Sequence, residues 1–252
     1  MRINVWFRQG GYLFVARSDQ RAADLAESVE LQRANGLSTE FVDAARCKKL
    51  VPELDASVVV GASYSPDDGV VFPWPFVWGY AEACRERGVV VRPHTEATAI
   101  ETTGGHVSAV VTTAGRIETP LVINAAGAWG PEVARLVGVE LPTHPHRHEI
   151  CSTEALKPFL QPLVADLATG VYFSQSMRGE IVGGISNDTV PPGLDQGSST
   201  RFLGLYAREL TRLMPVLGGV RVLRQWAGCY DITPDGSPIV GGVDGIEGLG
   251  ED

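Results

Sequence analysis

Leu121-Val122-Ile123-Asn124-Ala125-Ala126-Gly127-Ala128-Trp129 is the stretch that says most about the fold. Its first four residues predict a buried strand, and small residues follow before a helix with Pro131 in its first turn. Small side chains let a main chain approach a ligand closely, and nucleotides bind at the carboxyl ends of strands in open α/β sheets. From these residues alone, a nucleotide site and a tightly packed turn are equally good interpretations.

The residues before this stretch predict an α/β unit. A helix with one apolar face begins at Pro75 and ends at Gly88, and Val89-Val90-Val91 then has the unbroken apolar character of a strand buried on both faces. An antiparallel meander follows, with strands expected at about 97–102, 107–112 and 116–119. Buried strands alternating with helices are typical of α/β domains.

The remaining segments are richer in strands. The strands expected are 5–7, 12–16, 58–64, 149–153, 170–174, 180–185 and 222–231, and the helices are 19–35, 42–50, 132–137 and 199–213. Segments of α/β character and segments rich in strands alternate along the chain, which predicts two domains that are each discontinuous in sequence. We expect one domain to contain residues 1–73 and 139–224, and the other to contain 74–138 and 225–252.

Composition excludes several classes of function. The chain has 252 residues, 44% of them apolar, and a formal net charge of -9, so it lacks the basic patches of a nucleic-acid-binding protein. No apolar run is long enough for a membrane span or a signal peptide, so we expect a cytoplasmic protein. The four cysteines are far apart and favour separate buried thiols over a zinc site or a disulfide framework; they are Cys47, Cys84, Cys151 and Cys229.

A second motif lies about a hundred residues further on, from Trp226 to Pro238. It reads Trp-Ala-Gly-Cys-Tyr-Asp-Ile-Thr-Pro-Asp-Gly-Ser-Pro, in which a strand leads into a turn stiffened by proline. Together the two motifs resemble the D-amino-acid oxidase superfamily of flavoenzymes, and especially sarcosine oxidase β subunits and dimethylglycine-dehydrogenase-like proteins. The resemblance extends over nearly the whole chain.

This resemblance implies a fold and a cofactor. The fold would be a mixed α/β (α+β) arrangement, with a partial Rossmann-like FAD-binding domain interleaved with a substrate domain on a large mixed, mostly antiparallel sheet. The FAD would be bound non-covalently. The residues expected along it are Ala97 near the adenine; Ala125, Ala126, Gly127 and Trp129 in the turn; and Asp235 and Gly241 on the flavin side. The chemistry implied is oxidation of the C–N bond of a small, sarcosine-like amine or amino acid by hydride transfer to flavin.

Departures from the family pattern qualify this prediction. The chain contains neither the G-x-G-x-x-G segment with which the family begins nor the segment that closes on the flavin ring, so we expect a fragment. Pro73 stands where some sarcosine oxidase β subunits carry a histidine linked to FMN, so no covalent FMN is expected. Tyr230 stands where glycine oxidases place an arginine that binds the substrate carboxylate.

Two tyrosines are the catalytic candidates. Tyr230 is the stronger one because its loop belongs to the flavin side, whereas Tyr172 lies on a strand of the substrate domain and could equally be a packing residue. His144, His146 and His148 alternate along one strand, where a solvated or hydrogen-bonded strand is a better interpretation than a metal site. Arg8 is interpreted as a surface arginine and Trp129 mainly as packing.

Several alternatives stay open. The parent enzyme could instead be a D-amino-acid, proline or glycerol-3-phosphate dehydrogenase. The chain could also be a non-catalytic fragment, or a split-gene half that needs another chain to bind FAD, which would make a hetero-oligomer. The electron acceptor could be oxygen, a quinone or an electron-transfer protein.

Overall fold

The computed structural model describes residues 3–251 and divides into two units. Unit 1 comprises Met1–Glu86, His148–Asp188 and Gly197–Ala227; unit 2 comprises Arg87–Arg147, Thr189–Gln196 and Gly228–Asp252. Each unit is therefore assembled from three separate stretches of the chain. That one unit serves FAD and the other the substrate stays a prediction.

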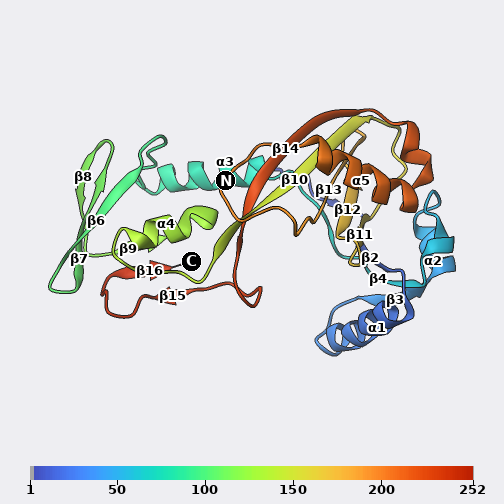
Figure 1. Ribbon diagram of the computed structural model, residues 1–252, viewed down its shortest axis with the longest axis horizontal. Coiled ribbons are helices and arrows are strands. Elements are labelled where there is room, and N and C mark those ends of the chain that lie inside the picture. The colour runs from blue at the N-terminus through green and yellow to red at the C-terminus, as the bar shows by residue number, and fades with distance from the viewer. Residues whose placement is uncertain (1–2, 252) are drawn as a thin grey trace. The chain divides into compact units, whose positions relative to one another are not determined.

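Unit 1 is built on an eight-stranded mixed sheet with the order β14-β10-β13-β12-β11-β2-β4-β3 (Figure 1). These strands are β2 Tyr12–Ala16, β3 Glu40–Asp43, β4 Gly61–Ser65, β10 His144–Ala155, β11 Leu163–Asp166, β12 Val171–Gln175, β13 Glu180–Ile185 and β14 Val222–Ile232. β11 pairs with β2 in parallel, whereas β12 pairs with both of its neighbours antiparallel. The mixed, mostly antiparallel sheet predicted from the sequence is thus confirmed.

The helices of unit 1 begin at well-defined caps. Ser18, Asp43 and Ser199 each accept a hydrogen bond from a main-chain N–H in the first turn of α1 Asp19–Ala34, α2 Ala44–Leu50 and α5 Thr200–Leu213, respectively. The predictions for α1 and α5 are confirmed. The prediction of a helix from residue 42 is wrong at its start, because Val42 is buried in β3 and the helix begins only after Asp43.

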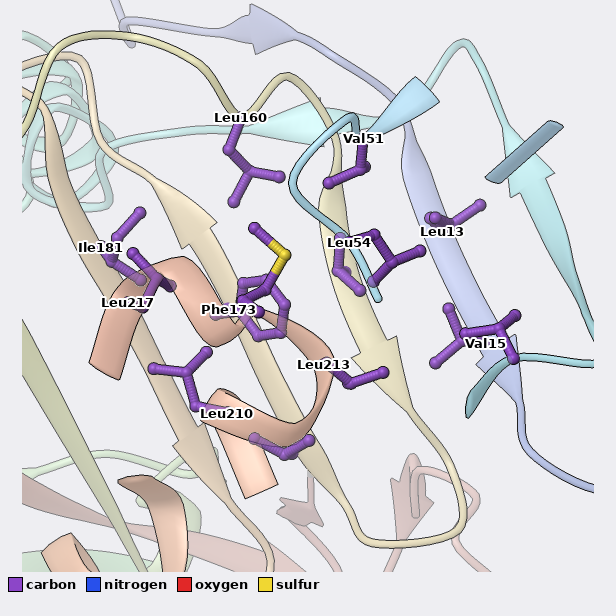
Figure 2. Close-up of a cluster of buried hydrophobic side chains, with 14 of the residues drawn as sticks. Leu13, Val15, Val51, Leu54, Leu160, Phe173, Ile181, Leu210, Leu213 and Leu217 are labelled. Atoms are coloured by element: carbon purple, nitrogen blue, oxygen red, sulfur yellow. The ribbon is translucent and has the colours of Figure 1, made fainter. Parts of the chain in front are cut away.

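One hydrophobic cluster holds α2 and α5 against this sheet. Phe173, fully buried in the middle of β12, lies at its centre, and Leu210 and Leu213 reach it from α5 (Figure 2). Leu13 and Val15 contribute from β2, and Val51 and Leu54 from the segment after α2. Burial of these side chains is the main stabilising term for unit 1. The short 3-10 helices η1 Ala56–Val58 and η3 Pro215–Gly219 border the same cluster.

Unit 2 contains two three-stranded sheets. The predicted meander is confirmed as β6 Ala97–Thr103, β7 His106–Thr112 and β8 Gly115–Glu118, which pair antiparallel in that order. The second sheet has the order β15-β16-β9, from β9 Val122–Asn124, β15 Gly241–Gly242 and β16 Leu249–Glu251. β9 leads into the 3-10 helix η2 Gly127–Trp129 and then α4 Gly130–Arg135. Ile100, Val107 and Leu249 form the core between these elements.

Three predicted strands differ from the structure. Val89-Val90-Val91 forms no strand, and its side chains are exposed, Val90 to 72%. The strand at 121–124 is half-buried, because Asn124 is buried whereas Ile123 is 66% exposed. Residues 5–7 also form no strand; the pairing there is limited to β1 Arg8–Gln9 with β5 Gly69–Val70. A strand needs a hydrogen-bonding neighbour, and an apolar run supplies none by itself.

The remaining features concern α3 and the cysteines. α3 Trp74–Glu86 forms near the predicted bounds, but Val77 and Tyr80 on its apolar face are exposed. All four cysteines are free, and Cys47 and Cys151 are buried as predicted, whereas Cys84 and Cys229 are only half-buried. Within residues 3–251, no helix combines the length and apolar character that crossing a bilayer requires.

Candidate functional site

A cavity of about 350 Å³ in unit 2 joins the two motifs singled out in the sequence. The end of β9 and the turn after it contribute Asn124, Ala126, Gly127 and Gly130 to its wall, and the end of β14 and the loop after it contribute Asp231, Thr233 and residues 236–239. Leu141 and Thr143 complete the lining. Its volume lies within the range of small-molecule sites in proteins.

Asn124 fixes the shape of the turn. Asn124 is only 3% exposed, and its side-chain amide nitrogen donates a hydrogen bond to the Gly130 carbonyl at 3.0 Å. Its amide oxygen accepts one from the Ala126 N–H at 3.3 Å. One side chain therefore ties the start of the turn to the start of α4 and holds residues 125–129 between them.

Gly127 keeps the turn open toward a ligand. Its φ of +54° belongs to the left-handed region, which residues other than glycine rarely adopt, and a Cβ placed there would meet no atom within 4 Å. The main chain at this point is therefore uncovered. Ala125 and Trp129 are also exposed and do not line the cavity, so Trp129 is not the packing residue that the sequence suggested.

The loop after β14 forms the opposite wall. The Ser237 N–H donates a hydrogen bond to the Asp235 carboxylate at 3.0 Å, and Gly236 between them has a φ of +73°. Asp235 thus shapes the loop, while its neighbours Gly236 and Ser237 line the cavity. Gly241 lies beyond the loop in β15, where it pairs with Glu251 of β16.

The cavity wall also contains a residue that sequence reasoning missed. The Thr143 hydroxyl oxygen is buried and has no hydrogen-bond partner among the described residues. Nothing in the sequence around Thr143 signals this, because a missing partner is a property of the folded chain. The charged residue in the lining is Asp231, and neither lysine nor arginine is among the residues that line the cavity.

Ala97 lies in a second hollow of unit 2, of about 470 Å³. Val90, Arg92, Thr95, Thr112 and Ile117 line it together with Ala97. Ala97 begins β6, so its main chain is fixed by pairing with Thr112 of β7. The hollow could receive a flat apolar group next to one guanidinium.

Tyr172 belongs to unit 1, where it forms a pair with His148. The Tyr172 hydroxyl and His148 Nε2 are 3.1 Å apart, and the two rings stack with their centroids 5.6 Å apart. Gly184 on β13 makes room for the pair, because a Cβ there would lie 2.9 Å from His148 Nε2 and 3.0 Å from the Tyr172 hydroxyl. His148 is thus a hydrogen-bonded strand histidine, which is the interpretation preferred from the sequence.

Tyr206 of α5 is buried in the interior of unit 1, which excludes water from its side chain. Its hydroxyl is buried, and burial raises its pKa well above the usual value, with Cys151 and Tyr172 adding to the effect. Burial likewise raises the pKa of the Cys151 thiol to about 12. A phenol and a thiol in such surroundings stay protonated and do not serve as nucleophiles.

The other candidates are placed as follows. Tyr230 lies near the end of β14 in unit 2 and is 53% exposed, next to Cys229, whose thiol lies 3.7 Å from the Gly193 carbonyl oxygen. Arg8 is not a surface arginine, because its guanidinium donates to the carbonyls of Leu160, Gln161 and Gln175 and burial lowers its pKa.

Among residues 3–251, no three His, Cys, Asp or Glu side chains gather as metal ligands would.

Comparison with solved structures and known proteins agrees with this geometry. The fold is that of amino-acid oxidoreductases: L-proline dehydrogenase from P. horikoshii superposes with a TM-score of 0.92 at 29% identity, over 97% of this chain and 66% of that one. Glycine oxidase from Geobacillus kaustophilus gives a TM-score of 0.89 at 24% identity, over 99% and 66% of the two chains. These two structures define the class, a mixed α/β oxidoreductase fold with a large mixed sheet.

The chain belongs to the FAD-dependent oxidoreductase (DAO) family, whose family model matches residues 1–249. A sarcosine oxidase subunit beta from Rhodobacter capsulatus is 31% identical over 98% of this chain and 61% of its own length. Human mitochondrial sarcosine dehydrogenase is 27% identical over 97% of this chain and 28% of its own length. The chain thus spans about three fifths of the length of the bacterial β subunit.

Proposed function

We propose that this chain is the main part of an FAD-dependent oxidoreductase that oxidises the C–N bond of a small amine or amino acid of the sarcosine type. The observation that carries the proposal is the cavity that the turn after β9 and the loop after β14 share. A chain of this family needs a place where main chain, rather than bulky side chains, meets a dinucleotide, and Ala126 and Gly127 offer one.

The cavity fits part of FAD, bound without a covalent link. Its wall includes small residues such as Ala126, Gly127 and Gly236, one of its hydroxyl oxygens is buried without a partner among the described residues, and its volume suits a fraction of the cofactor rather than the whole. Ala125, Ala126, Gly127 and Trp129 would lie along the FAD, and the hollow beside Ala97 would take the adenine. Asp235 and Gly241 would shape the flavin side.

When bound, FAD would supply the oxidising chemistry, as the acceptor of a hydride from the carbon next to the amine. The chain's own residues hold and orient. In unit 1, Tyr172, held by His148, is the residue proposed to bind the substrate by a hydrogen bond. In unit 2, Tyr230 is proposed as a residue of the flavin side. A tyrosine whose hydroxyl is already oriented loses little conformational freedom when a substrate arrives.

Support for the substrate class comes from the relatives. Their names specify sarcosine, L-proline and glycine, which are all small α-amino acids, and sarcosine and proline are secondary amines. Turnover of sarcosine, D-proline and glycerol 3-phosphate, measured in parallel with oxygen uptake and with dye reduction, would separate the substrate classes and the electron acceptors. Turnover of glycerol 3-phosphate alone would contradict the amine proposal.

Binding of FAD is the first experiment. The purified chain is titrated with FAD, and the quenching of flavin fluorescence and the absorbance spectrum are recorded. Saturable binding with a shifted flavin spectrum is expected. If the flavin spectrum changes neither with this chain alone nor after addition of the segments of the bacterial β subunit that this chain does not match, the proposal is wrong.

A second candidate function is that of a half-site completed by another polypeptide. The observation favouring it is the exposed apolar surface of unit 2, where Val90 and Ile123 are 72% and 66% exposed. Surfaces of that kind are typical of protein contacts. The relatives named as subunits of larger enzymes agree with such an arrangement. FAD binding that appears only after a separately produced G-x-G-x-x-G segment is added would favour this function over the first.

A further inference from the structure

We infer that Thr143 is a ligand-binding residue of the cavity and that its hydroxyl forms a hydrogen bond with the uncharged, flavin-side portion of the bound cofactor. The inference rests on the proposed function, because it takes the cavity to be a flavin site. Three observations lead to it: a hydroxyl without a partner, its position in the wall, and the charge of the surrounding residues.

The hydroxyl is the first observation. A buried polar group that forms no hydrogen bond destabilises a protein, and such groups are few in native structures. Thr143 carries one, and it lies just before β10, between Leu141 of the cavity wall and the strand. An energetic cost of this kind is recovered when a ligand provides the missing partner.

The second observation is geometric. Thr143 lines the same cavity as Gly127 and Ser237. Its hydroxyl is closed off from water in the free protein. Rotation about the Cα–Cβ bond moves the threonine hydroxyl among three staggered positions on Cβ, so we expect a bound ligand to meet the oxygen after one rotamer change.

The third observation selects the part of the ligand. Asp231 is the charged group in the cavity wall, and no lysine or arginine lines it. A carboxylate disfavours a phosphate in the same small space, because like charges repel. The cavity therefore suits the ring carbonyls or ribityl hydroxyls of a flavin and not its pyrophosphate. The phosphate-bearing portion would lie outside it.

The test uses Thr143→Val, which keeps the shape of the side chain and removes only the hydroxyl. Thr143→Ser is the variant that keeps the hydroxyl. Thr119→Val is the matched control in the same unit, because the Thr119 hydroxyl is satisfied by the Leu121 carbonyl at 2.8 Å and lies outside the cavity lining. Each full chain is titrated with FAD, riboflavin and ADP, and its thermal midpoint is measured without ligand.

Two effects of opposite sign are expected for Thr143→Val. Its thermal midpoint rises by about 2–6 °C because an unsatisfied group is removed, whereas its affinity for FAD and riboflavin falls by about threefold to tenfold. ADP binding is unchanged, and Thr143→Ser restores the flavin affinity. Thr119→Val lowers the midpoint and leaves riboflavin binding unchanged.

The outcomes separate the two proposals. If wild type binds riboflavin and Thr143→Val binds it equally well, the inference about Thr143 is wrong while the flavin site stands. An unchanged or lower midpoint for Thr143→Val also overturns the inference, because the hydroxyl would then have a partner. If wild type binds no flavin under any condition, the proposed function fails and the role of Thr143 fails with it.

Discussion

A leucine in place of Gly127 should weaken cofactor binding at a small cost to folding. Gly127 and Gly36 both have positive φ, +54° and +85°, and a Cβ at either position would meet no atom within 4 Å. Replacing either glycine by leucine therefore costs only the backbone strain of the left-handed region, about 1–2 kcal/mol of unfolding free energy. The two variants should be equally destabilised, because neither creates a clash.

Only Gly127 lines the cavity, whereas Gly36 follows α1 in the other unit. Gly127→Leu places four carbon atoms where the cofactor would lie, so its FAD affinity should fall by at least about tenfold, which equals about 1.4 kcal/mol of binding free energy. Gly36→Leu should bind FAD as wild type does. Urea unfolding measures the stability of both variants, and flavin fluorescence measures their affinity.

The reasoning would be refuted by either of two results. In the first, Gly127→Leu binds FAD as tightly as wild type, which would mean that the cofactor does not lie against this turn. In the second, Gly36→Leu loses as much affinity as Gly127→Leu, which would mean that the loss reflects reduced stability and not an occupied cavity.

Three further predictions concern the core, pH and the substrate. Phe173→Ala should lower the unfolding free energy by about 3–5 kcal/mol in urea titrations, whereas the exposed Leu31→Ala should change it by less than about 0.5 kcal/mol; equal effects would contradict the packed core of unit 1. Burial in the folded protein raises the pKa of Cys151 to about 12 and that of Cys47 to about 11, from the ordinary thiol value of 9.0. The unfolded chain therefore loses these protons at lower pH than the folded protein does. The free energy of unfolding should be fully retained below pH 9 and should fall as pH rises through 11 to 12. The loss reaches about 1.4 kcal/mol per pH unit and thiol, and Cys151→Ala should show a shallower urea-midpoint profile than wild type; identical profiles would refute this. In steady-state assays, Tyr172→Phe should lower kcat/KM for the amine by about tenfold and leave the affinity for FAD unchanged. An unchanged kcat/KM would show that Tyr172 does not bind the substrate.

Local signals in the sequence were sufficient for much of the fold. α5 and β13 form where their patterns indicate, because a capping serine and an alternation of side chains are visible within a few residues. Val89-Val90-Val91 shows the limit of such signals. Its composition favours a strand, but hydrogen bonding requires a neighbour that only the folded chain can supply, and none pairs with it in the described part of the chain.

The candidate site was predictable only in part. The two motifs were found in the sequence, and Ala126 and Gly127 do line one cavity with the loop after β14. Thr143 and the pairing of His148 with Tyr172 were not predicted, because each depends on residues that are distant in the sequence or on the absence of a partner. Resemblance to a family identifies the residues of a motif, whereas contacts between distant residues are known only from the folded structure.

The alternation of the two units along the chain has a consequence for any attempt to take the protein apart. The polypeptide changes unit after Glu86, Arg147, Asp188, Gln196 and Ala227, so no single cut releases either unit whole. A protease cut in one of these connections would leave segments of at least one unit on both products. A protein that contains one unit alone would therefore need its three stretches to be joined by new linkers.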